Sequence, residues 1–146
     1  MMQMKSRKYM TGFLGVSMFM VGFLKFFNPF KGWYAVQISS SGFGDLSYAM
    51  GIFGELVVGV ALLYVLLFPH RFKLKWYYAI NLTASAMVVV MMAVGILVHL
   101  HPEVPADVLP LKIKPPFIPA FFLLLGVAHG VLIAKEAMVN KVLVAN

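Results

Sequence analysis

The chain has 146 residues, of which 62% are hydrophobic and only 12% are charged. A soluble domain carries about 25% charged residues, so this composition excludes a water-exposed globular surface and also a disordered or collagen-like chain. The net charge of +7 would suggest nucleic-acid binding in a polar protein. Because the mean hydropathy is +0.90, the charge instead indicates basic loops that orient membrane helices. We therefore expect no nucleic-acid partner.

The first predicted element is a hydrophobic helix over residues 9–27, which is long enough to cross the roughly 30 Å hydrocarbon layer of a bilayer. Lys5, Arg7 and Lys8 precede it, as basic residues precede a signal peptide. The apolar stretch is too long for a signal peptide and lacks an A-x-A cleavage pattern, so we expect the helix to be retained. Pro29 follows it, and proline ends a helix because it lacks an N–H.

Residues 28–45 form the next segment, which is half apolar and too long for a tight turn. We expect a short re-entrant or interfacial helix here, followed by a Ser/Gly turn at residues 39–44. The apolar side chains that would form this helix are Phe30, Trp33, Tyr34, Val36 and Ile38.

Three further stretches have the length and apolar character of membrane spans: residues 46–68, 76–100 and 116–135. Pro69 and Pro102 stand just beyond the ends of the first two. Residues 101–115 contain four prolines, and we expect them to form an irregular cap. The predicted fold is therefore an all-α, integral membrane, antiparallel four-helix bundle, built as a single transmembrane domain over residues 1–146.

The basic residues are distributed unequally between the two sides of this bundle. Eight of the twelve fall on the side of the termini: Lys5, Arg7, Lys8, Arg71, Lys73, Lys75, Lys135 and Lys141. The opposite side has Lys25, Lys31, Lys112 and Lys114, together with Asp45, Glu103 and Asp107. Because basic loops remain in the cytoplasm, we predict cytoplasmic termini and a multi-pass protein in the lipid bilayer of a bacterial or archaeal plasma membrane.

Small and polar residues recur at steps of three and four along each predicted span. Such residues mark the faces where helices meet inside lipid, where little hydrophobic force acts between helices. The four sets are Gly15, Met18, Gly22 and Lys25; Gly51, Glu55, Gly59 and Leu62; Asn81, Ser85, Val88, Met92, Gly95 and His99; and Pro119, Phe122, Gly126, His129 and Ile133. An ionisable group inside a membrane costs about 3 kcal/mol on insertion scales, which favours a function for the charged members beyond packing.

Lys25 and Glu55 are predicted to form an ion pair between the first two spans. With a rise of 1.5 Å per residue, Lys25 lies about 3 Å, and Glu55 roughly 10 Å, from the outer end of its helix. Two roles stay open: a salt bridge that joins the helices, or a desolvated Glu55 that holds or relays a proton in an outward-facing cavity. His99, near the outer end of the third span, is placed to join this cluster.

His129 lies roughly 18–20 Å below the outer end of the fourth span, near the middle of the bilayer. It is either a neutral imidazole hydrogen-bonded across the bundle or a contact for a proton or substrate. The depths of His99 and His129 differ by more than about 15 Å, which argues against a haem between them. We expect no metal site and assign no catalytic residue; the candidate ligand-binding residues are Lys25, Glu55, Asn81, His99 and His129.

Three segments of the first half resemble the DoxX-like family of small membrane proteins. They are GFLKFF at residues 22–27, SGF at residues 41–43 and GELVVGVALL at residues 54–63. Lys25 matches the lysine of the family's G-x-x-K pattern, and Glu55 matches the glutamate that opens the second span. The second half is similar mainly in topology, and the basic residue that usually follows the second helix comes here after Pro69 and His70.

The resemblance implies a four-helix membrane bundle and two kinds of function. The family's namesake is a membrane subunit of an archaeal thiosulfate:quinone oxidoreductase, and other relatives belong to oxidative-stress membrane complexes. This implies an accessory subunit that binds a quinone or similar small amphiphile in the outer half of the bundle and receives electrons from a redox partner protein. A distant animal branch assists receptor assembly, which implies the alternative, a non-catalytic assembly factor or small-molecule carrier. Both readings are compatible with a homo-oligomer.

Overall fold

A computed structural model describes residues 2–145, with side chains described for residues 6–140, so the side chains of Lys5 and Lys141 lie outside the described set. Residues 2–145 contain no strand, which confirms the all-α class for this part of the chain. The α-helices are α1 (Met2–Leu24), α2 (Phe30–Ser40), α3 (Asp45–Leu67), α4 (Leu74–Leu100) and α5 (Phe117–Ala145).

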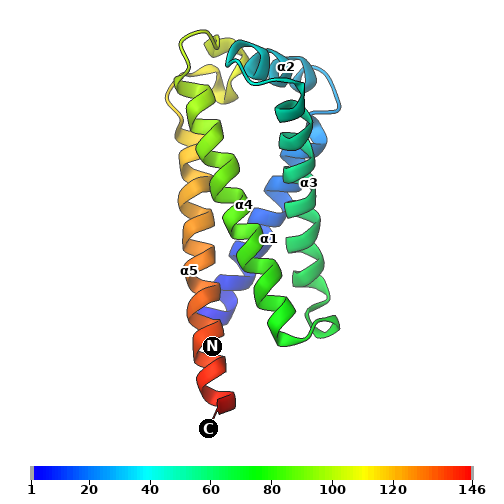
Figure 1. The fold of residues 1–146 in the computed structure, drawn as a ribbon, viewed down its shortest axis with the longest axis vertical. Helices are drawn as coiled ribbons and strands as arrows, with labels where there is room; N and C mark the ends of the chain where they lie inside the picture. Colours follow the sequence, from blue (N-terminus) through cyan, green and yellow to red (C-terminus); the bar gives the residue numbers. More distant parts are fainter. Residues whose placement is uncertain (1, 146) are drawn as a thin grey trace.

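The four long helices pack as two pairs that contact each other (Figure 1). α1 packs along α3, and α4 packs along α5; contacts between α3 and α4 and between α1 and α5 join the pairs. Both chain ends and the α3–α4 connection lie toward one end of the molecule, which we call the terminal end. α2 and the α4–α5 connection lie at the opposite end, which we call the cap end.

Three of the described helices are long and apolar enough to cross a membrane. They are α3, α4 and the part of α5 at Phe117–Asn140. α1 is not among them within the described residues. It begins at Met2 rather than at residue 9, so its first turns include Arg7 and Lys8, whose charges lower the hydropathy of the helix.

The helix ends differ from the predicted ones where hydropathy and backbone structure do not coincide. α5 continues to Ala145, ten residues past the predicted end at residue 135. The prediction ended at the charged residues Lys135 and Glu136, but a charge limits only the apolar stretch and leaves the backbone hydrogen bonds intact. α1 ends at Leu24, three residues early, because Phe26 and Phe27 form turn hydrogen bonds to the carbonyls of residues 23 and 24.

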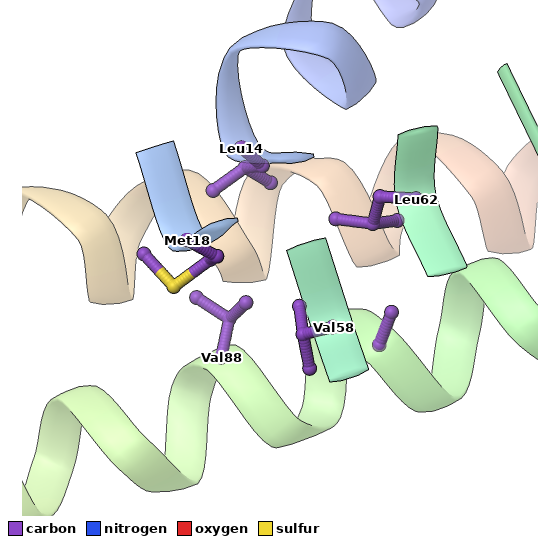
Figure 2. Close-up of a cluster of buried hydrophobic side chains, with 6 residues drawn as sticks. Leu14, Met18, Val58, Leu62 and Val88 are labelled. Carbon is purple, nitrogen blue, oxygen red and sulfur yellow. The ribbon is translucent and has the colours of Figure 1, made fainter. Parts of the chain in front are cut away.

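The core lies midway along the long helices and includes Met18, Leu62 and Val88 of the predicted packing faces. Its buried residues come from three helices: Leu14 and Met18 of α1, Val58 and Leu62 of α3, and Ala84 and Val88 of α4 (Figure 2). Phe122 and Leu125 of α5 pack against this cluster. Gly59 permits the close approach of α1 and α3, since a Cβ atom there would lie 2.5 Å from the backbone nitrogen of Phe19.

The cap end contains the short helix that the sequence predicts within residues 28–45. α2 buries Tyr34 and Ile38. The side chain of Gln37 donates a hydrogen bond to the carbonyl of Val108, which lies in the α4–α5 connection. Gly42 has φ +75, a left-handed conformation that glycine adopts without strain, and it completes the turn into α3. The hydrogen bond between Gln37 and Val108 therefore joins α2 to the α4–α5 connection at the cap end.

Candidate functional site

Lys25 and Glu55 form the ion pair predicted from their depths. Lys25 Nζ lies 2.6 Å from Oε1 and 2.7 Å from Oε2 of Glu55. The lysine follows the last residue of α1, and the glutamate lies on the face of α3 that packs against α1. Their side chains are only 13% and 8% exposed, so the lysine turns inward, and the pair is shielded from water.

Tyr34 of α2 covers this pair from the cap end. Its ring centroid lies 3.8 Å from Lys25 Nζ, which is a cation–π contact. Its hydroxyl lies beside Gly51 of α3, where a Cβ atom would overlap the phenol oxygen. Burial, followed by the charge of the nearby Glu55, raises the pKa of Tyr34, so the phenol stays protonated. The ammonium group thus lies against both a carboxylate and an aromatic face.

Tyr34 was not among the residues predicted to form the site. The sequence places it only among the apolar side chains of a short re-entrant or interfacial helix. No spacing in the sequence links residue 34 to residues 25 and 55, since the contact arises only when α2 folds back over α3. The glycine at residue 51, on the same face as Glu55, was the available signal that a bulky group packs there.

A hollow of about 310 Å³ opens beside this cluster at the cap end. Its lining residues are Ala35, Val36, Ile38, Ser39, Phe43, Asp45 and Tyr48. The Tyr48 ring lies 4.9 Å from the Tyr34 ring, so two aromatic rings connect the hollow with the Lys25–Glu55 pair. This volume is at the lower end of the range of small-molecule sites.

The structure does not bring His99 to the Lys25–Glu55 pair. Its Nδ1 atom lies 3.3 Å from the carbonyl oxygen of Lys114, in the segment that leads into α5. The expectation that it joins the pair is therefore corrected. The cause is that α4 packs chiefly against α5, whereas the ion pair lies between α1 and α3.

His129 and Asn81 belong to a second polar group, which is nearer the terminal end. The buried imidazole of His129 lies 2.8 Å from the Thr11 hydroxyl through Nε2 and 2.7 Å from the Ser85 hydroxyl through Nδ1. Asn81 is fully buried one turn before Ser85, and its Nδ2 donates to the Tyr77 carbonyl at 2.9 Å. The five predicted site residues therefore fall into three separate places.

Arg7 and Glu136 form an ion pair beside this second group that sequence reasoning missed. The sequence assigned Arg7 to a basic N-terminal segment and placed Glu136 beyond the last span. The available signal was that Glu136 lies two helical turns after His129, and so on the same face of α5. Within residues 6–140 no three histidine or acidic side chains are grouped so that they could hold a metal ion.

The geometry offers an open hollow whose lining includes the rings of Phe43 and Tyr48, and the Tyr34 ring lies between Tyr48 and the buried Lys25–Glu55 pair. Such a site can bind a flat or amphiphilic molecule by ring stacking and apolar contact.

No protein-family model matches the chain, and neither curated proteins nor solved structures give a match.

Proposed function

We propose that this chain is a DoxX-like membrane protein with four spans and cytoplasmic termini. Support for the fourth span comes from α1, which packs along the apolar α3 and contributes Leu14 and Met18 to the shared core. Support for the orientation comes from the basic residues at the terminal end, among them Arg71 and Lys73 in the α3–α4 connection. In this orientation the cap end faces outward.

We propose that the chain binds a quinone or similar small amphiphile in the hollow at the cap end. The observation that carries the proposal is the continuous contact from the hollow through Tyr48 and Tyr34 to the buried Lys25–Glu55 pair. The rings of Phe43 and Tyr48 provide stacking faces. The Ser39 hydroxyl donates to the Val36 carbonyl at 3.2 Å, and it would turn from that carbonyl to donate to a quinone oxygen. In this proposal the chain is an accessory subunit, and a partner redox protein supplies the electrons.

Tryptophan fluorescence tests this proposal, because quinones quench nearby indoles and the chain has two tryptophans. Trp33 lies on α2 at the cap end, whereas Trp76 lies on α4 near the terminal end. A short-chain quinone should quench the tryptophan fluorescence of the Trp76→Phe variant, which keeps Trp33, and the quenching should saturate. The Trp33→Phe variant should show much weaker quenching. Equal quenching of both variants would contradict a site at the cap end.

A matched pair of tyrosine variants on α3 tests whether the hollow is the binding site. Tyr48→Ala removes a ring that lines the hollow, and we expect it to weaken quinone binding about tenfold, which is the value of one buried stacking contact. Tyr64→Ala removes an exposed ring on the same helix and should leave binding unchanged.

Mass spectrometry of material purified from native membranes separates the two classes of function. A copurified quinone together with a redox partner protein would support the accessory subunit. A preparation with neither, and without saturable quenching, would favour the alternative of an assembly factor or small-molecule carrier.

A further inference from the structure

The imidazole of His129 is held between two hydroxyl groups that belong to two other helices. Thr11 Oγ1 of α1 lies 2.8 Å from Nε2, and Ser85 Oγ of α4 lies 2.7 Å from Nδ1. Each hydroxyl also lies within hydrogen-bond distance of a carbonyl one turn earlier on its own helix, 3.0 Å for Arg7 and 2.8 Å for Asn81. The imidazole therefore lies in the middle of a row of four short polar contacts.

A count of hydrogens shows what this row can accommodate. Each of the four contacts needs one hydrogen between its two heavy atoms, and each hydroxyl supplies one. A neutral imidazole supplies a third, so one contact in the row lacks a hydrogen. A doubly protonated imidazole supplies the fourth, and then both hydroxyls donate to their carbonyls and accept from the ring. Protonation of His129 thus completes the row without any movement of heavy atoms.

We propose that His129 is a reversible proton-binding site among α1, α4 and α5. In the neutral state one hydroxyl, of Thr11 or of Ser85, rotates to donate to the ring, and its own carbonyl loses that bond. When a proton binds to the free ring nitrogen, this hydroxyl turns back and becomes an acceptor. The proton comes from water at the terminal end and returns there, so one proton is gained and lost in each cycle. This site does not depend on a ligand in the hollow.

The charged and titratable groups near the imidazole come from each of the three helices. Arg7 of α1 opposes a positive charge on His129, but it is paired with Glu136 of α5, whose carboxylate offsets that charge. Tyr77 and Tyr78 of α4 complete the set, and the Tyr77 ring centroid lies 5.5 Å from the guanidinium carbon. The Glu136 side chain is 32% exposed, so the ion pair lies between the buried imidazole and water.

Nitrogen NMR of the histidine rings, recorded on the whole chain in lipid nanodiscs, tests this proposal. We expect one ring, identified by its loss in His129→Gln, to change reversibly from one to two protonated nitrogens as the pH falls from 8 to 3.5. If His129→Gln does not fold, the variants His70→Gln, His99→Gln and His101→Gln identify the remaining signal by elimination. A ring that stays singly protonated down to the pH at which helical circular dichroism is lost would overturn the proposal.

The hydroxyl variants test whether the row of contacts sets the proton affinity. Ser85→Ala and Thr11→Val each remove one acceptor from the doubly protonated ring, and we expect each to lower the proton affinity about tenfold or more. Thr83→Val removes an exposed hydroxyl of α4 and should leave the titration of His129 unchanged. If His129 takes up its proton at the same pH in both Ser85→Ala and Thr11→Val as in the unsubstituted chain, the hydrogen count is wrong.

Discussion

The amino group of Lys25 is buried, and the two groups that offset its charge come from different elements. Glu55 supplies a carboxylate that contacts it through both oxygens, and Tyr34 supplies an aromatic face. A buried ion pair of this kind contributes little net stability, because both ions lose water, but removal of one partner leaves an uncompensated charge. The two partners should therefore respond unequally to substitution.

Lys25→Met should be the more damaging substitution. It leaves the Glu55 carboxylate buried without a partner, and we expect a loss of about 3–5 kcal/mol in the free energy of unfolding. Protonation neutralises that carboxylate, so the variant should regain stability as the pH falls from 8 to 5. Glu55→Gln should be milder, because the Tyr34 ring still faces the ammonium, and the double variant Lys25→Met/Glu55→Gln should be milder than Lys25→Met alone.

Thermal melts in detergent across this pH range measure these differences. Lys31→Met is the matched control, since Lys31 is exposed and belongs to α2, which lies at the same end of the molecule. If Lys25→Met melts at the same temperature as the unsubstituted chain at every pH, the ion pair has no role in stability.

Contacts of individual site residues were predictable only where the depth of each residue along its own helix was sufficient. For Lys25 and Glu55 these two depths follow from the rise per residue, and they place the side chains within reach of each other. The contacts of His129 with Thr11 and Ser85 depend on the relative rotation of three helices, and no sequence spacing encodes that rotation. His99 was assigned wrongly for the same reason, since depth alone did not reveal which neighbour α4 faces.

At the scale of the helices, the spacing of small residues predicted the packing faces. Leu62, Val88 and Ile133 lie on the predicted faces and are fully buried. Gly59 marks the closest approach of α1 to α3 that involves backbone atoms. The helix ends were less predictable, because an apolar stretch measures the depth of the membrane rather than the length of a helix.

Gly59→Ala should separate α1 from α3. A methyl group at this position would meet backbone atoms of Phe19, which cannot rotate away, so we expect a loss of about 1–3 kcal/mol in the free energy of unfolding. Gly32→Ala is the matched control, since a Cβ atom in this part of α2 meets only the Asn28 side chain at 3.7 Å. Thermal melts in which the two variants behave alike would contradict the assigned role of Gly59.

At the scale of the whole molecule, the four long helices run between two ends: α2 and the α4–α5 connection lie at one end, and both termini and the α3–α4 connection lie at the other (Figure 1). Three of these helices meet the length and hydropathy of a span without reference to packing. The crossing of α1 is a prediction that follows from its contacts with α3.

The absence of cysteine in the sequence makes this crossing easy to test. In Ser6→Cys the thiol lies at an exposed position near the start of α1. We expect a membrane-impermeant maleimide to label it only after the cells are permeabilised, as for Lys73→Cys in the α3–α4 connection. Labelling of Ser6→Cys but not of Lys73→Cys in intact cells would mean that α1 does not cross, whereas labelling of both would mean that the orientation is reversed.

One labelling measurement tests the central claim, an outward-facing ligand site at the cap end, most directly. Ser39→Cys places a thiol on the lining of the hollow, and Glu103→Cys places one on the other cap segment. We predict that the impermeant maleimide labels both variants in intact cells, and that a short-chain quinone slows the labelling of Ser39→Cys alone. If Ser39→Cys is labelled only in permeabilised cells, or at the same rate with and without quinone, the site is not where we place it.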